Sequence, residues 1–291
     1  MPSIDSLFID SGAFGLWARY AKGKSPEKTL EFYDSQIFWD YVKDYADFVK
    51  RYADAIQLYA NVDVFYNPKL SWKVQRVLEE MGCHPVPVLH CGASMDWVKF
   101  YRDQGYEYIG LGGLVNKAIP RSEKEKWISQ VFTTISKPDG TPSLKVHGFG
   151  ITNFRMLRDY PWWSVDSTSW VKEAAYGGIY IPRRTRGEFD FVRDPYVIKA
   201  SGKSGKIKML GMHLTTVTEE ERSIMLAWLE LIGVPMGSVD AAGEEIERGV
   251  LTHRDDRMKA NLLYFEHLRR HLPDWPWPFR PKLYRQGFSV Q

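Results

Sequence analysis

The chain has 291 residues, of which 44% are hydrophobic, and a formal net charge of +3. This length can bury a large core as one main domain, and the mild positive charge is compatible with a polyanionic partner without requiring one. Its two cysteines, Cys83 and Cys91, are too few for a disulfide framework or a four-ligand zinc site. With no leader pattern and no long apolar run, the sequence predicts an intracellular protein that does not associate with membranes.

Short apolar runs that end in Gly, Asp or Asn alternate with amphipathic stretches along the first 210 residues. Such alternation is typical of strands followed by helices. Strands are expected at 6–10, 55–60, 85–90, 107–111, 144–147, 162–166 and 178–181, with an eighth somewhere in 196–210. A helix is expected at 35–53, where these apolar residues recur at helical spacing: Ile37, Tyr41, Tyr45, Phe48, Val49 and Tyr52.

The series of strand and helix units carries no dinucleotide-binding glycine fingerprint after its first strand. This favours a closed (β/α)8 barrel of the TIM type for residues 1–210, although an open sheet would produce much of the same pattern. Residues 211–291 are predicted as a C-terminal extension that begins with helices, the first opened by a capping box from Thr218 to Glu221. The segment PDWPWPFRP at 273–281 is too rich in proline for a helix and is expected to lie against the barrel.

Polar residues stand at the C-terminal ends of the predicted strands, where parallel barrels carry their chemistry. They are Asp10, Asn61, Asp63, His90, the run GLGGL at 110–114, the run HGFG at 147–150, and Asp166. Each also has a structural interpretation, since an Asp before Ser can cap a helix, glycines can form turns, and a lone His is often structural. Their coincidence at successive strand ends favours a shared active site.

Four of these motifs occur in an order that resembles a known family. DSGAF at 10–14, GLGGL at 110–114, HGFG at 147–150 and SVDS at 164–167 are similar to motifs of the tRNA-guanine transglycosylase superfamily. The resemblance extends over about residues 5–185. It implies a (β/α)8 barrel that exchanges guanine in a nucleic acid for a 7-deazaguanine without a cofactor.

The resemblance also implies a role for each matching residue. Asp166 aligns with the nucleophilic aspartate, and Asp10 with the aspartate that acts as general acid and base. Phe14 is expected to stack on the bound base, His147 to cover its other face, and Asp63 to read the guanine edge. The other residues expected at the base are Ser11, His90, Gly112, Gly113, Leu114 and Gly148, and the backbone of 112–114 would supply amide donors.

The chemistry also follows from the residue types themselves. Breaking an N-glycosidic bond builds positive charge on the sugar, and a carboxylate can stabilise that charge or trap it as a covalent glycosyl-enzyme. A second carboxyl group can move the proton that the departing or arriving base must gain or lose. The small side chains around Asp166, which are Ser164, Ser167, Thr168 and Ser169, are expected to orient it. A paired base must be flipped out to reach such a site.

Departures from the family pattern narrow the expected substrate. Members that act on tRNA usually carry a Cys-x-Cys-x-x-Cys plus His zinc site, but no cysteine follows Cys91 here. The chain is too short for the additional RNA-binding domain of archaeal members, and His90 stands where the family has a glutamine. These features resemble the smaller relatives of phages and bacterial gene clusters, which insert 7-deazaguanines into DNA. The expected partners are DNA and a 7-deazaguanine base, without metal or cofactor, in the cytoplasm, which for a phage-encoded protein is that of its host.

Two basic stretches follow the predicted catalytic strands, RRTR at 183–186 and KASGKSGKIK at 199–208. Lys and Arg on loops rich in Gly and Ser can follow a phosphate backbone, although a charged loop can also be merely solvated. The residues expected to meet phosphates are Arg183, Arg184, Arg186, Lys199, Lys203, Lys206 and Lys208.

Three alternatives to the DNA enzyme stay open. The first is a tRNA-directed transglycosylase that has lost its zinc, and the second is a non-catalytic, nucleic-acid-binding partner subunit. The third is an unrelated barrel glycosidase with two carboxyl groups about 5 Å apart. The presence of both Asp10 and Asp166 argues against the non-catalytic subunit. The sequence leaves open which deazaguanine is used and whether the protein forms a homodimer.

Overall fold

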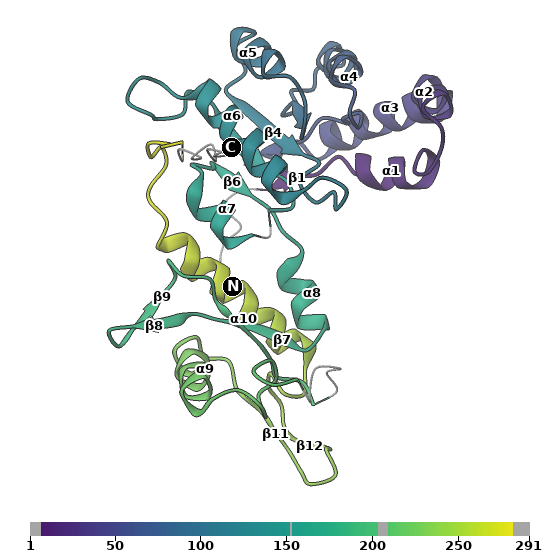
Figure 1. Cartoon of the computed structure of the whole chain (residues 1–291). Coiled ribbons are helices and arrows are strands. Elements are labelled where there is room, and N and C mark those ends of the chain that lie inside the picture. Colours follow the sequence, from purple (N-terminus) through teal and green to yellow (C-terminus); the bar gives the residue numbers. More distant parts are fainter. Residues whose placement is uncertain (1–6, 152, 203–208, 282–291) are drawn as a thin grey trace, which may run out of the picture. The chain divides into compact units, whose positions relative to one another are not determined.

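The computed structural model describes residues 7–151, 153–202 and 209–281, which fall into two compact units (Figure 1). Unit 1 comprises Met1–Ile151, Asp159–Asp166 and Trp275–Gln291, and unit 2 comprises Thr152–Arg158 and Ser167–Asp274. Residue 210, where the sequence predicts a domain boundary, lies inside unit 2. None of the helices in the described parts of the chain is long and apolar enough to cross a membrane.

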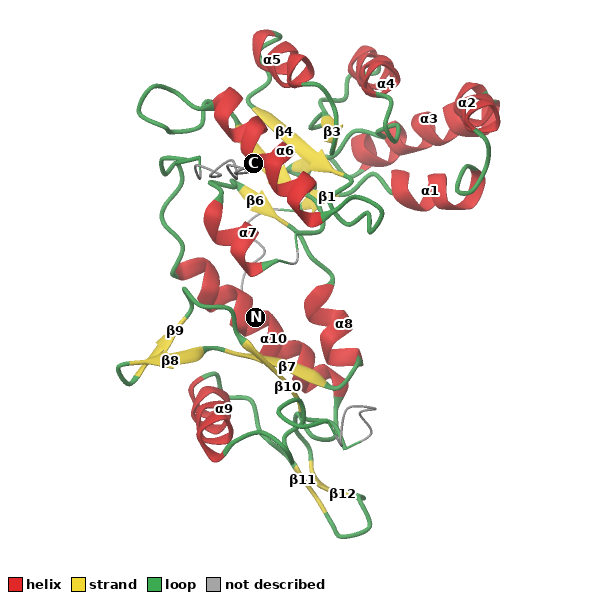
Figure 2. Ribbon diagram, in the orientation of Figure 1, coloured by secondary structure: helices red, strands yellow, loops and turns green. Residues whose placement is uncertain are grey.

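The described part of unit 1 contains six short strands, which pair in parallel, and six helices. Figure 2 shows these helices and several of the strands. Its strands are β1 (Phe8–Ile9), β2 (Leu58–Tyr59), β3 (Val88–His90), β4 (Tyr108–Gly112), β5 (Lys145–Gly148) and β6 (Ser164–Val165). Its helices are α1 (Ala13–Tyr20), α2 (Pro26–Asp34), α3 (Gln36–Arg51), α4 (Pro68–Glu80), α5 (Met95–Asp103) and α6 (Arg121–Ile135). Each of these strands lies within one residue of its predicted range, so the alternating pattern is confirmed.

The parallel strands of unit 1 follow one another in chain order. β3, β4, β5 and β6 form a four-stranded sheet in that order, and β1 pairs with β2. A parallel bridge between Ala60 and Val86 connects the segment after β2 with the segment before β3. The α/β class is therefore confirmed.

A closed eight-stranded barrel is not shown by the described residues. The predicted seventh strand, β7 (Gly178–Ile181), forms, but it pairs antiparallel with β10 (Tyr196–Lys199) in unit 2. Only the hairpin of β8 (Arg183–Thr185) and β9 (Glu188–Asp190) separates these two strands. Because a parallel neighbour needs a long crossover, usually a helix, this connection suits the antiparallel arrangement.

The predicted helix at 35–53 is confirmed as α3, but its buried face differs from the predicted one. Ser35 caps its first turn by accepting a hydrogen bond from the backbone N–H of Phe38. The core side chains are Phe38, Val42, Tyr45, Ala46 and Val49. Ile37, Phe48 and Tyr52 of the predicted set are exposed instead. Tyr45 and Val49 of the predicted set are buried, but the helix carries apolar residues on both sides, so spacing alone does not select its whole buried face.

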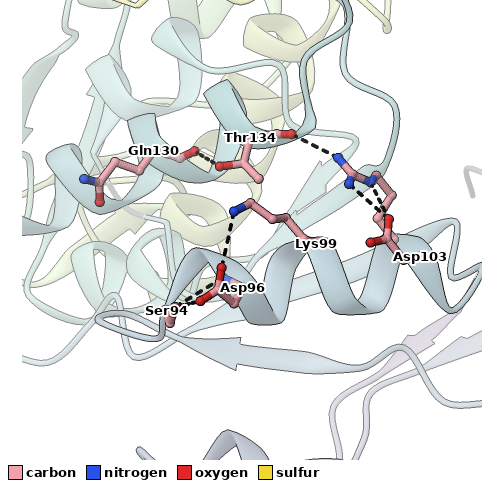
Figure 3. A network of polar contacts seen from close by, with 7 residues as sticks. Ser94, Asp96, Lys99, Asp103, Gln130 and Thr134 are labelled. Carbon is pink, nitrogen blue, oxygen red and sulfur yellow. Dashed lines mark hydrogen bonds and ion pairs between the residues drawn. The ribbon is translucent and has the colours of Figure 1, made fainter.

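A network of polar side chains lies over α5 and α6 (Figure 3). Ser94 caps α5 by accepting from the backbone N–H of Asp96, and Lys99 pairs with the Asp96 carboxylate at 3.3 Å. Arg102 donates to the carbonyl oxygen of Thr134 on α6 and pairs with Asp103. Such exposed ion pairs stabilise a fold by about 1 kcal/mol or less, so this network orients the two helices more than it stabilises them.

Unit 2 is built around α10 (Arg254–Arg270), whose polar residues hold its neighbours by hydrogen bonds. Asn261 is fully buried, accepts from the backbone N–H of Tyr180 and donates to the carbonyl oxygens of Trp170 and Gly178. Its other elements are α7 (Phe154–Asp159), which ends at the junction with unit 1, α8 (Ser169–Ala175), α9 (Glu219–Leu231), β11 (Ser238–Val239) and β12 (Glu245–Glu247). The predicted capping box from Thr218 to Glu221 begins α9 and is confirmed.

The proline-rich segment after α10 belongs to unit 1 from Trp275 onward and is not helical over residues 273–281. The indole N–H of Trp275 donates to the carbonyl oxygen of Pro161 at 3.1 Å. The ring of Phe279 stacks on Tyr160 with centroids 5.5 Å apart, and its backbone N–H donates to the carbonyl oxygen of Gly140. This segment thus covers part of the core of unit 1.

Candidate functional site

The polar residues predicted at the strand ends lie in unit 1, close to one another. Asp10 follows β1, Asp63 follows β2, His90 ends β3, and Asp166 follows β6. The negative charges of both Asp63 and Asp166 act on Asp10, so the three carboxyl groups lie within one electrostatic neighbourhood. Parallel strands that follow one another bring their carboxyl ends to one edge, which accounts for this gathering.

Asp10 begins a tight turn between β1 and α1. Gly12 has a left-handed φ of 72°, and a Cβ atom at this position would lie 2.7 Å from the Tyr41 hydroxyl oxygen. That hydroxyl donates to the carbonyl oxygen of the buried Ser11 at 2.6 Å, so α3 holds the turn in place. Asp10 adjoins a cavity of about 380 Å³ whose lining comes from β1, this turn and α3.

The surroundings of Asp10 favour its protonated form. Loss of surrounding water, followed by the charges of Asp63 and Asp166, raises the pKa of the Asp10 carboxyl. The backbone N–H groups of Gly12 and Ser11 act in the opposite sense but are outweighed. A carboxyl group whose pKa is moved toward neutrality is suited to general acid and base catalysis.

Asp166 is shifted in the other direction. Burial raises the pKa of its carboxyl, but the neighbouring His147 and the hydrogen bond from the backbone N–H of Gly150 outweigh this and leave the pKa below its usual value. The Gly150 N–H donates to Oδ1 at 2.5 Å, and His147 Nε2 lies 3.7 Å from the same oxygen. The Asp166 side chain is 54% exposed, so the ionised oxygen is accessible to a substrate.

His147 does not present an open ring face, contrary to what the resemblance implies. Its side chain is 5% exposed and lies between Phe8 and Phe149, with ring centroids 4.5 and 4.4 Å away. Its Nδ1 is 2.6 Å from the Ser164 hydroxyl oxygen. Because the ring is enclosed in this way, its contacts place it beside Asp166 and not over a base.

Asp63 and His90 form a buried pair at the ends of β2 and β3. The Nε2 atom of His90 contacts Asp63 Oδ2, and both side chains are almost fully buried. Among the described residues, His90 Nδ1 has no hydrogen-bond partner. His90 lines a cavity of about 410 Å³, together with Ser71 and Trp97. Of the pair, His90 is the member that faces this cavity.

The remaining residues of the predicted base site differ in their surroundings. Phe14 on α1 is 57% exposed and offers an aromatic surface suited to stacking. Gly113 has a left-handed φ of 74°, and Leu114 after it is buried. A Cβ atom at Gly112 would lie 3.2 Å from the His90 ring, and one at Gly148 would lie 2.7 Å from Ile151. The space beside Gly148 therefore leaves no room for a Cβ atom unless a neighbour shifts, and the space beside Gly112 is tight.

The basic residues predicted to bind phosphates lie in unit 2 and divide into two groups. Arg184 and Arg186 are exposed on the β8–β9 hairpin, while Arg183 lies over the Tyr196 ring at 4.2 Å and donates to the carbonyl oxygen of Asp194. Lys199 does not fit the prediction that it meets a phosphate, because its amino group pairs with Glu173 and its side chain is only 12% exposed. Lys203, Lys206 and Lys208 lie outside the described residues.

Sequence reasoning missed part of the support around Asp166. It expected Ser164, Ser167 and their neighbours to orient the carboxylate, but Ser164 contacts His147, and Ser167 donates to the Ser169 hydroxyl. The Gly150 N–H and the Tyr108 hydroxyl, which is hydrogen-bonded to Ser164, were not predicted. Ser164 lies two residues before Asp166, so the alternation of side chains along a strand could have placed both on one face. The contacts of Gly150 and Tyr108 could not be found in this way, because they depend on how neighbouring strands run in space.

Cys83 and Cys91 are both buried and free. Within the parts of the chain that the structure describes, no three His, Cys, Asp or Glu side chains are grouped so as to hold a metal ion. Comparison of the chain with family models, with curated proteins and with solved structures finds no match.

Proposed function

We propose that this protein exchanges guanine in DNA for a 7-deazaguanine through a covalent aspartyl-glycosyl intermediate. The observation that carries the proposal is the pair of neighbouring carboxyl groups whose pKa values move in opposite directions, upward for Asp10 and downward for Asp166. Two titratable groups that their environments push apart are the usual basis for a division between acid and nucleophile. The four family-like motifs then select base exchange among the reactions that such a pair can perform.

In the proposed reaction, one glycosidic bond replaces another. A carboxylate oxygen of Asp166 attacks the anomeric carbon as the bond between sugar and guanine breaks, and protonated Asp10 gives its proton to the departing base. The incoming deazaguanine then loses a ring N–H proton to Asp10, and its nitrogen displaces Asp166 from the sugar. Atoms and charge balance over the two steps, and Asp10 is returned to its protonated form.

Two features of unit 1 support the proposed substrate and fold. The exposed ring of Phe14 is suited to stacking on a planar base, and the buried Asp63 carboxylate could accept hydrogen bonds from the guanine edge. The parallel strands β1 to β6 succeed one another in chain order, as the first six strands of a (β/α)8 barrel do. The complete barrel is part of this proposal.

The β8–β9 hairpin supports nucleic acid as the partner. Its turn residues Arg186 and Gly187 have φ values of 53° and 87°, as in the type I′ turns that join hairpin strands closely. Such a turn holds the exposed side chains of Arg184 and Arg186 on a short, rigid support. Guanidinium groups presented in this way suit contacts with phosphates.

The test is incubation of the protein with an isotope-labelled 7-deazaguanine and single-stranded DNA, duplex DNA or tRNA, followed by mass spectrometry of the nucleosides. We expect label in DNA, and a loss of about 10³-fold or more in the Asp166→Asn variant. Asp139→Asn is the control, because Asp139 is an exposed acid whose contacts are to Thr141 in its own turn. Label in tRNA alone would support the zinc-less tRNA enzyme, and binding without exchange would support the non-catalytic subunit.

A further inference from the structure

A chain of polar contacts leads from β4 and β6 to the Asp166 carboxylate through the His147 ring. The Tyr108 hydroxyl is hydrogen-bonded to the Ser164 hydroxyl, which lies 2.6 Å from His147 Nδ1. On the other side of the ring, Nε2 lies 3.7 Å from Asp166 Oδ1. His147 and Ser164 are direct partners in the register of β5 and β6, so adjacent strands set these contacts.

The chain of hydrogen bonds can run from Tyr108 toward the histidine. Burial raises the pKa of Tyr108 to about 12, so its hydroxyl keeps a proton to donate to Ser164. Ser164 then donates its own proton to His147 Nδ1.

The direction fixes the tautomer of the histidine. A neutral imidazole that accepts a hydrogen bond at Nδ1 carries its proton at Nε2, which is the atom that faces Asp166. The rings of Phe8 and Phe149 enclose the imidazole and hold its orientation. At 3.7 Å the contact is longer than a hydrogen bond, so the N–H acts on the carboxylate as an oriented dipole.

We propose that Tyr108, Ser164 and His147 are positioning residues that present a fixed Nε2–H to Asp166 and hold this carboxylate in its anionic form. Asp166 is the nucleophile only under the proposed function, so the catalytic value of the relay rests on that proposal. The tautomer of His147 and the titration of Asp166 do not rest on it. Asp10 is the other titratable group whose charge interacts with Asp166, and it is kept intact in the variants below.

The first measurement is NMR of protein labelled with ¹⁵N in its histidines and ¹³C in its aspartates. We expect the Nε2–H tautomer for His147 and an Asp166 titration at lower pH than an ordinary aspartate. Ser164→Ala should give a mixture of both tautomers and move the Asp166 titration to higher pH, and Tyr108→Phe should do so more weakly. Ser164→Thr restores the hydroxyl and should restore both signals. His147→Gln and Asp166→Asn assign the two resonances.

Tyr106→Phe is the matched control, because this tyrosine precedes the same strand but its hydroxyl is bonded to Glu79. It should leave both His147 and Asp166 unchanged. An unaltered tautomer and an unaltered Asp166 titration in Ser164→Ala would overturn the proposed relay. A folded His147→Gln protein in which Asp166 titrates as in the wild type would also overturn the proposed relay.

The second measurement is the rate of covalent adduct formation with single-stranded DNA as a function of pH in a single turnover. Ser164→Ala should move the acid limb of the profile to higher pH, and Ser164→Thr should return it. A merely structural contact would lower the rate at every pH without moving the limb, and that result contradicts a positioning role. If the wild type forms no adduct with DNA or tRNA, the proposed function fails, while the NMR measurements still decide the relay.

Discussion

Asp10 shows how a proposed catalytic role and stability can conflict in a single side chain. Its carboxyl has a raised pKa, so ionisation costs more in the folded protein than in the unfolded chain. The stabilising effect of the protonated form is present below the ordinary pKa of 3.8 and is lost as the pH rises through the folded value. At neutral pH the unfolded chain ionises this carboxyl readily while the folded protein disfavours the anion, so the group lowers the stability of the fold there.

We predict that Asp10→Asn raises the midpoint of thermal unfolding at neutral pH while it strongly lowers base exchange. Asparagine keeps an oxygen that can accept from the N–H groups of Gly12 and Ser11 but removes the charge that Asp63 and Asp166 repel. The gain should disappear below pH 3.8, where the wild-type carboxyl is also neutral. Scanning calorimetry across this pH range measures it, and a lower midpoint at neutral pH would contradict the prediction.

At the scale of elements, the turn between β1 and α1 depends on a glycine for two separate reasons. Gly12 has a left-handed φ, and the Tyr41 hydroxyl occupies the space of a Cβ atom. We expect Gly12→Ala to lower the free energy of unfolding by more than the cost of about 1–2 kcal/mol for left-handed backbone alone. Gly23→Ala is the control, because Gly23 has a φ of 76° with no atom within 4 Å of a Cβ.

Denaturant unfolding of both variants measures this difference. Tyr41→Phe in the Gly12→Ala background should recover part of the excess loss, since it removes the oxygen that collides. Equal losses for Gly12→Ala and Gly23→Ala would mean that the space beside Tyr41 opens without cost. Gly12→Ala should also disturb the candidate site, because the same turn carries Asp10.

The β8–β9 hairpin gives a prediction about binding. Replacing Arg184 and Arg186 with Ala should weaken DNA binding for all sequences, and each lost phosphate contact should reduce the salt slope by about 0.9. Lys199→Ala should instead lower the stability of unit 2, because it leaves Glu173 without its partner, and should leave the salt slope unchanged. Fluorescence anisotropy at several salt concentrations separates the two cases, and a slope unchanged in the double Arg variant assigns the hairpin to solvated surface.

Several elements and site residues could be predicted from the sequence, and the misses have physical reasons. The strand pattern placed Asp10, Asp63, His90 and Asp166 at strand ends because apolar runs end visibly at these residues. The antiparallel pairing of β7 with β10 could not be predicted, since the sequence of a short strand does not determine whether the neighbouring strand runs parallel or antiparallel to it. The burial of Lys199 likewise depends on Glu173, a distant residue.

At the scale of the whole molecule, the proline-rich segment completes unit 1. Phe279 is buried and its ring stacks on Tyr160. We predict that Phe279→Ala lowers the stability of unit 1 by about 3–5 kcal/mol, as for other buried phenylalanines. Trp277→Ala, at a partly exposed position in the same segment, should cost less. Chemical denaturation followed by the fluorescence of the other tryptophans measures both, and equal effects would contradict the prediction.

The contact between Trp275 and Pro161 also bears on how the protein is made. A ribosome builds the strand that precedes Asp166 well before it builds the segment that covers Pro161, and all of unit 2 from Ser167 onward is synthesised in between. The nascent unit 1 must therefore wait with Tyr160 and Pro161 uncovered while another compact unit forms.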